Sequence, residues 1–245
     1  MKNDDGVSEA IGFILIFSIV VIGIAIVVLY GFPLLIAGQG SADMRNMEQT
    51  MIVLQNDLKS ISYKMVPYKE TALQVQGGML FVTGDSGTFE VLVDGDSKYN
   101  SPVGQIRYVS DLDATRIVFE NGAVLTRPEL GTGSAMIAEP RWYYDDQSNT
   151  LILSFIEIET ERERALAGVG RIEMKVGYIN TTENDVGGGD VILRYTPDSG
   201  DSYSVAWDNY MSGRLGMTSD GAGVYRLSNV SRLVTKRTVI TISGF

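Results

Sequence analysis

The chain has 245 residues, no cysteine, no histidine and a formal net charge of −10. The two missing residue types exclude disulfides, thiolate or imidazole zinc sites, and catalysis that depends on a cysteine or histidine side chain. The acidic balance argues against nucleic-acid binding, which needs clustered lysine and arginine.

A long apolar segment lies near the N-terminus. Residues 10–42 contain no charged side chain, and the run up to Tyr30 lacks the polar stripe that a soluble helix carries. About 20 apolar residues span a bilayer core of about 30 Å as a helix. Tyr30 stands where an interfacial aromatic is expected, and Gly31-Phe-Pro33 allows a kink or a break. We therefore predict one transmembrane helix over residues 7–36.

A short polar leader, residues 1–6, precedes this segment. The step from Gly6 to Val7 follows Asp5 and lies ahead of the apolar run, so cleavage there would keep the helix. This pattern resembles the class III signal peptide of archaeal type IV pilins, which a prepilin peptidase cuts ahead of the hydrophobic segment. The resemblance implies processing between Gly6 and Val7. An ordinary secretory signal cut after Gly40-Ser-Ala42 is the competing interpretation.

Glu9 is a lone carboxylate at the start of the apolar run. In type IV pilins generally, an acidic residue just after the cut pairs with the free amine of a neighbouring subunit, and the resemblance implies this role for Glu9. Pairing is physically reasonable because an isolated charge inside an apolar filament core is costly. The alternative is a carboxylate in the headgroup layer, near the positive end of the helix dipole.

Residues 37–69 are predicted to hold a hinge and an amphipathic helix. Gly38-Gln-Gly40-Ser41 indicates a short flexible break, and a heptad stripe then predicts a helix over residues 42–65, ending before Pro67. The stripe consists of Met44, Met47, Met51, Leu54, Leu58, Ile61 and Met65. Its partner is either another copy in a coiled coil or the chain's own β domain, which is the commoner arrangement.

Residues 70–245 are predicted to form a β-rich domain of short strands and Gly-rich turns, typical of an antiparallel sandwich. Asn121-Gly122 between two apolar runs predicts a type I′ hairpin. Residues 151–158 predict a well-buried strand, Thr160–Leu166 a helical turn, and Thr182–Asp190 a loop with three glycines. The fold class is therefore α+β: a transmembrane helix and an amphipathic connector helix, followed by a mainly antiparallel, sandwich-like domain.

Loose motifs extend the resemblance beyond the leader. These are Asn46-Met-Glu48, the Gly77-Gly78 step, Phe119-Glu-Asn-Gly-Ala-Val124 and Glu139-Pro-Arg-Trp142. With the N-terminus, they are similar to an uncharacterised family of archaeal pilin-like envelope proteins over residues 1–145. That family has no established activity, so the resemblance implies location and architecture rather than chemistry.

Acidic side chains cluster at several places. The clusters are Asp94-Gly-Asp96, Asp111-Leu-Asp113, Asp145-Asp146 and the run from Glu157 to Arg164. None has the spacing of a calcium loop, and turns explain the first three. The run is expected to be a solvated, self-paired charged face. We predict no metal and no cofactor, and we expect Trp142-Tyr-Tyr144 in the core rather than against a ligand or sugar.

Two Asn-x-Ser/Thr sequons are candidate glycosylation sites in an exported domain, at Asn180 and Asn229. Asn180 lies in a polar stretch that we expect to be a loop. Together with the acidity and the leader resemblance, the sequons favour an extracellular position for the β domain.

The sequence predicts a non-enzymatic, membrane-anchored, pilin-like structural subunit of a cell-surface filament or envelope. The chain would cross the cell membrane once, with its C-terminal domain outside. Its expected partners are membrane lipid, a prepilin peptidase, and identical or related pilin subunits, but no nucleic acid. The alternative is a non-polymerising single-pass surface protein for binding or adhesion. A third hypothesis, a carboxylate-dependent hydrolase, requires two carboxylates converging in a pocket.

Overall fold

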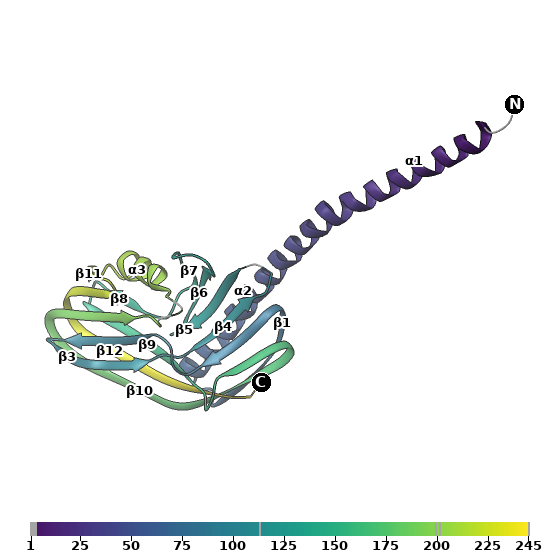
Figure 1. Cartoon of the computed structure of the whole chain (residues 1–245). Coiled ribbons are helices and arrows are strands. Elements are labelled where there is room, and N and C mark those ends of the chain that lie inside the picture. The colour runs from purple at the N-terminus through teal and green to yellow at the C-terminus, as the bar shows by residue number, and fades with distance from the viewer. Residues whose placement is uncertain (1–3, 113, 199, 201, 245) are drawn as a thin grey trace.

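The computed structural model describes residues 4–244 except 113, 199 and 201, with residues 4–9 described by their backbone alone. Figure 1 shows a long helical rod that leaves a β-rich domain and ends far from it at the N-terminus. The strands pair mainly antiparallel in one sheet. The predicted α+β class, an apolar N-terminal helix followed by a mainly antiparallel β domain, is confirmed.

A π-helical turn interrupts the rod without breaking it. The rod consists of α1 (Asp4–Ile26), the π turn η1 (Val27–Gly31) and α2 (Phe32–Lys64). Pro33 has no N–H to donate to the carbonyl of Leu29, and its ring would crowd that carbonyl in a regular helix. The wider turn, in which the Phe32 N–H donates to the Val27 oxygen, accommodates the proline. The structural effect of the proline is therefore a π turn.

The flexible break predicted at residues 38–41 is wrong, because α2 runs straight through them. Gly40 is buried, and a Cβ placed on it would lie 3.1 Å from the Cβ of Leu112. The glycine therefore permits a close approach of the helix to the β domain rather than freeing the backbone. α2 ends where Met65 takes a left-handed conformation with φ of 54°, two residues before Pro67.

Among its described residues, the β domain contains twelve strands in one sheet, together with one short helix. The elements are β1 (Tyr68–Thr83), β2 (Thr88–Val93), β3 (Asp96–Pro102), β4 (Gln105–Ser110), β5 (Thr115–Glu120), β6 (Ala123–Pro128), β7 (Ala135–Ala138), β8 (Tyr143–Asp145), β9 (Thr150–Glu159), β10 (Arg164–Thr196), α3 (Ser204–Gly213), β11 (Thr218–Gly221) and β12 (Val224–Gly244). The main order is β7-β6-β5-β4-β1-β10-β12-β9-β8. The hairpin of β2 and β3 pairs with the far end of β10, and β9 runs parallel to β12.

Two local predictions in the β domain are wrong. Thr182–Asp190 is not a loop but part of β10, paired with β12. Its glycines form a bulge instead, because Gly187 and Gly188 have positive φ where the register shifts. Thr160–Leu166 is not a helical turn, since β10 begins at Arg164 after a short irregular link.

Two apolar cores lie on the two faces of β5, β6 and β9. In β9, Phe155 belongs to the aromatic-rich core near α3, whereas the next residue, Ile156, belongs to the core beneath α2. This alternation follows from the pleat of the strand, which points successive side chains to opposite faces. It confirms the well-buried strand predicted over residues 151–158, which is one residue shorter than β9 at each end.

The amphipathic stripe of α2 packs on the chain's own sheet. Six of its members are buried in the second core: Met44, Met47, Met51, Leu54, Leu58 and Ile61. Met65, the last member, is 73% exposed. A coiled coil with another copy through this stripe is therefore contradicted, because its apolar positions are already covered by β1, β4, β10 and β12.

Candidate functional site

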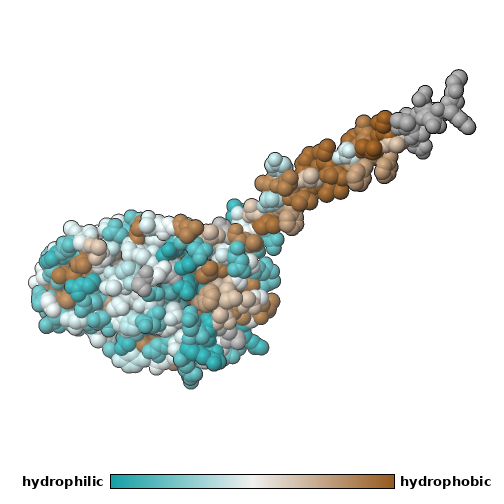
Figure 2. Space-filling model, in the orientation of Figure 1, coloured by the Kyte–Doolittle hydropathy of each residue, from teal (hydrophilic) through white to brown (hydrophobic). Residues whose placement is uncertain are grey.

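The apolar half of the rod is the most conspicuous exposed feature. Every large apolar side chain from Ile11 to Ile36 is exposed, and the helix from Ala10 onward is long and apolar enough to cross a membrane. Figure 2 shows this stretch as a brown band outside the β domain. Soluble monomers rarely expose contiguous apolar patches of this kind. The segment therefore needs a covering, which lipid or other helices can supply.

The rod enters the β domain through close contacts at small residues. Besides Gly40 on Leu112, Gly77 of β1 faces Asp43 of α2 so closely that a Cβ on Gly77 would lie 2.6 Å from Oδ2 of Asp43. Asp43 is buried, and its Oδ2 has no hydrogen-bond partner in the described part of the chain. These contacts fix where the apolar half leaves the domain.

Gln55 ties the helix to two loops deeper in the domain. Its Nε2 donates to the oxygens of Gly122, at 2.7 Å, and Glu139, at 3.0 Å. Gly122 and Asn121 have φ of 81° and 47°, which confirms the predicted type I′ turn. The rod and the sheet are therefore coupled by directed polar contacts as well as by apolar packing.

The aromatic side chain of Trp142 lies in the core, as predicted. It is 4% exposed and its Nε1 donates to the Ser154 oxygen at 2.7 Å, while Tyr143 beside it is exposed. A buried carboxylate that the sequence did not single out, Glu120, accepts from Nε1 of Trp207 at 2.8 Å. These contacts give the segment near Asn121 and the segment near Trp142 a role in core packing.

The proposed processing residues lie at the start of α1. Gly6, Val7 and Glu9 have helical backbone, and the side chains of Val7 and Glu9 are outside the described part of the structure. The Glu9 hypothesis therefore stays a prediction.

Both sequon asparagines are exposed, and both lie in strands rather than loops. Asn180 is in β10, opposite Arg237 of β12. Asn229 is in β12 with φ of 61°, at a register irregularity, and its backbone oxygen accepts from the Tyr144 hydroxyl at 3.3 Å. The exposed side chains leave room for a glycan at either position, although the local structure differs from the loop predicted for Asn180.

The acidic clusters do not converge as metal ligands. No group of three or more acidic residues with a ligand arrangement occurs among the residues that the structure describes. Asp94 and Gly95 have positive φ in the turn from β2 to β3, as expected for turn residues. Asp145 accepts a short hydrogen bond from Ser148, which lowers the pKa of its carboxyl. Asp113 lies outside the described residues.

One member of the predicted solvated run is buried. Glu157 is 3% exposed and accepts two bonds from Arg237, at 2.8 and 2.9 Å, and one from the Tyr99 hydroxyl at 2.8 Å. The guanidinium is held charged, and its pKa is raised by these bonds. The expectation of a self-paired surface run is therefore wrong for Glu157, because its partner comes from β12. The alternation of side chains between the two faces of β9 is the signal that could have indicated a buried position for Glu157, because it lies two residues after the core residue Phe155.

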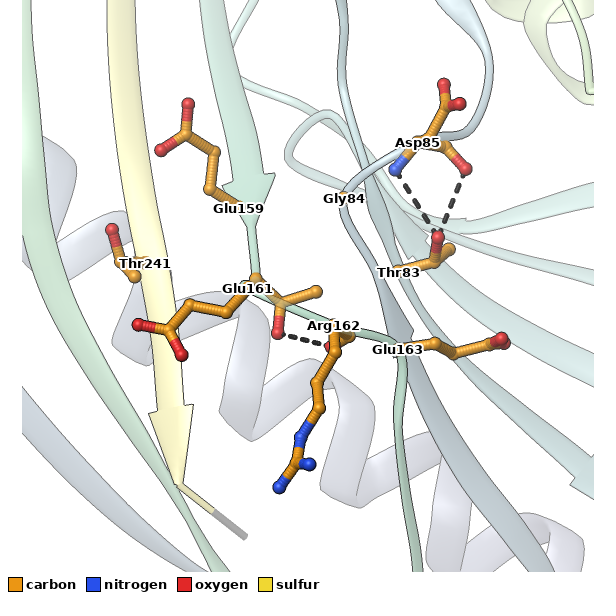
Figure 3. Close-up of a pocket in the computed structure, with 9 residues that line it drawn as sticks. Thr83, Gly84, Asp85, Glu159, Glu161, Arg162, Glu163 and Thr241 are labelled. Atoms are coloured by element: carbon orange, nitrogen blue, oxygen red, sulfur yellow. Dashed lines mark hydrogen bonds between the residues drawn. The ribbon is translucent and has the colours of Figure 1, made fainter.

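The rest of the run forms an acidic hollow of about 500 Å³. It is defined by Asp85, Glu159, Glu161 and Glu163, with Arg162 among them. Figure 3 shows that the carboxylates of Glu159, Glu161 and Glu163 point in different directions around the hollow. Such a spread presents a broad acidic surface rather than one ion site.

Comparison with known proteins identifies a family but no activity. No curated protein and no solved structure matches the chain. A model described as a family of unknown function, DUF7289, matches residues 6–241. Since this match spans most of the chain, the protein belongs to the family of unknown function DUF7289.

Proposed function

We propose that the protein is a pilin-like structural subunit, anchored by its N-terminal helix and assembled into a cell-surface filament or envelope. The observation that carries the proposal is that the two halves of one continuous helical rod have different environments. From Gly40 onward the rod packs into the β domain, whereas every large apolar side chain between Ile11 and Ile36 is uncovered. A bilayer would cover this half before assembly, and neighbouring helices would cover it afterwards.

The energetic scale supports a covered state. Burying one Val, Leu, Ile or Phe side chain contributes about 1.5–3 kcal/mol, and the exposed half carries many of them. The rigid attachment of α2 to the sheet through Gln55 favours a subunit whose domain and rod move together.

The leader and Glu9 complete the proposal. Cleavage between Gly6 and Val7 would leave a free amine at the start of the apolar rod, two residues before Glu9. Within an apolar bundle, the Glu9 carboxylate and the amine of another copy would neutralise each other. We further propose that the β domain is extracellular and that Asn180 and Asn229 are open to glycosylation.

The first test is the N-terminal residue of the mature chain, measured by intact-mass spectrometry on native membranes. We expect a chain that starts at Val7 and keeps its apolar helix. A chain that starts near Asp43 would overturn the proposal, because the helix would have been removed. A chain with an intact Met1 would favour the non-polymerising surface protein instead.

Assembly is tested with Glu9→Gln, which keeps the shape of the side chain but removes its charge. We expect normal cleavage and membrane insertion but loss of sedimenting filaments. Glu48→Gln, on the polar side of α2, is the matched control and should assemble as the wild type does. Equal assembly of both variants would rule out the pairing role of Glu9.

A further inference from the structure

A basic hollow lies near the C-terminal end of α2. This cavity of about 470 Å³ is lined by Lys59, Lys64, Arg141 and Tyr63. The guanidinium carbon of Arg141 lies 4.4 Å from the centre of the Tyr63 ring, and Nζ of Lys236 lies 4.9 Å from it. No salt bridge within the described chain involves any of the four cations Lys59, Lys64, Arg141 and Lys236. Three cations thus line one hollow, and Lys236 lies against the Tyr63 ring that borders it, in a chain of net charge −10.

The cations crowd one another. Burial lowers the pKa of Lys59, and the charge of Arg141 lowers it further; the same two causes act in the same order on Lys236. The Glu139 carboxylate opposes the shift at Lys59, but it lies 3.4 Å from Arg214 and is shared with that cation. Bound carboxylates would relieve the repulsion among these cations.

The acidic hollow has the opposite charge, and its carboxylates likewise form no salt bridges within the described chain. Asp85, Glu159, Glu161 and Glu163 form no salt bridge to any residue that the structure describes. Its volume, about 500 Å³, is close to that of the basic hollow. Because its carboxylates are spread apart, they suit several separate cations better than a single bound ion.

The two hollows lie on opposite faces of the pair formed by β9 and β12. Thr238 faces α2, since its hydroxyl lies 2.8 Å from that of Ser62, and Lys236 shares this face because it donates to the Ser62 oxygen at 2.7 Å. Thr241, which lines the acidic hollow, is three residues beyond Thr238 on an unbulged stretch and so points to the other face. One copy therefore cannot bring its own two hollows together.

Lipid headgroups are a poor match for the basic hollow. At 1.5 Å per residue, Lys59 lies about 35 Å along the helix from Ile36, where the apolar segment ends. Surface charge is screened within about 8 Å at physiological ionic strength. An anionic membrane surface at that end of the helix would therefore not reach the cations.

We propose that the acidic hollow of one copy docks on the basic hollow of the next, as a head-to-tail contact between subunits. This inference rests on the proposed function and names the surfaces that the β domains would use. A contact between two different surfaces repeats without limit unless the rotation closes a ring, so it suits a filament. The contact would add to helix packing and would set the register of neighbouring subunits.

The natural absence of cysteine makes the contact testable by crosslinking in native membranes. Ser60→Cys places a thiol at the basic hollow, and Thr160→Cys places one at the acidic hollow. With a short bis-maleimide, we expect the double variant to give a ladder of multimers and each single variant to give no ladder. Dimers from Ser60→Cys alone would overturn the proposal, because the basic hollow would then face the basic hollow of another copy.

Charge reversal in the double-cysteine chain provides the second readout. Glu161→Lys with Glu163→Lys should reduce the crosslinked fraction at least about tenfold, since like charges would then oppose each other. Adding Lys59→Glu and Arg141→Glu should restore the ladder. Failure of the combined variant to recover, while its membrane level and unfolding midpoint match the wild type, would overturn the pairing.

The outcomes separate this contact from the proposed function. A chain that starts at Val7 and sediments as filaments, but gives no ladder, would overturn the docking and leave the structural role standing. An intact Met1 without sedimenting assemblies would overturn both. Saturable binding of citrate to the full chain in detergent, lost with Lys59→Glu and accompanied by no ladder, would assign the basic hollow to a soluble oxyanion instead.

Discussion

Gly77 and Asp43 meet where the helical rod enters the β domain. A Cβ on Gly77 would lie 2.6 Å from Oδ2 of Asp43, and Gly77 has φ of +62°. Two separate constraints therefore require glycine at this position: the left-handed backbone and the space that the carboxylate occupies. The contact joins β1 to the first buried turn of α2, so it bears directly on how the rod is held.

Gly77→Ala should lower the free energy of unfolding by about 1–3 kcal/mol more than a control that shares only the backbone constraint. The control is Gly95→Ala, where φ is +86° and, apart from its two chain neighbours, no described residue has an atom within 4 Å of the new Cβ. Chemical denaturation of the full chain in detergent measures both variants. Equal losses would mean that the contact with Asp43 relaxes without strain.

The bond between Glu157 and Arg237 should contribute far more to stability than a surface pair of the same type. Glu157→Ala removes a buried carboxylate that accepts two bonds from Arg237, one from Tyr99 and one from Ser101, and we expect a loss of about 3 kcal/mol. Glu70→Ala breaks the exposed pair with Arg171, at 2.7 Å, and should cost much less, because water and salt screen a surface pair. Unfolding midpoints in urea compare the two, and similar losses would contradict the difference in burial.

Tyr225 should make stability fall in alkali. Burial, followed by the nearby Asp208 carboxylate that its hydroxyl bonds, raises the pKa of Tyr225 from 10 to about 12. The folded state therefore holds this proton longer than the unfolded chain, so the stabilisation is present below pH 10 and is lost between pH 10 and 12.

Tyr225→Phe should cost about 1 kcal/mol at pH 7, through the lost hydrogen bond, and should lose less further stability between pH 10 and 12 than the wild type. Burial also raises the pKa of Tyr195 and Tyr210, so the variant will still weaken in alkali. The difference between the two unfolding curves across this pH window isolates Tyr225. A parallel loss in both proteins would contradict the raised pKa.

The helical elements could be predicted because their signals are local. The apolar run and the heptad stripe each specify a helix through side-chain periodicity alone. The stripe could not specify its partner, since Met47 or Leu54 would pack equally well on another helix or on a sheet. The flexible break predicted at Gly40 is wrong for a related reason. A glycine that permits close packing has the same sequence signature as one that permits bending, and Leu112 is distant in the chain.

The strands were less predictable because their partners lie far apart in the sequence. Thr182–Asp190 looks like a loop locally, yet β12 holds it in the sheet by pairing from the other end of the domain. Glu157 looks like part of a charged surface until Arg237 is placed beside it. The two hollows have the same origin, since Arg141 and Lys59 come from distant segments and their proximity depends on the tertiary fold.

The exposed half of the rod should require an unbroken apolar surface for membrane integration. Ile22→Lys places a charge near the middle of the apolar run, where insertion costs about 3 kcal/mol. Gln49→Lys, on the exposed side of α2, adds the same charge outside the run and is the matched control. We expect extraction with alkaline carbonate to release Ile22→Lys but not Gln49→Lys. Retention of both to the same extent would mean that the segment is held by protein contacts rather than by lipid.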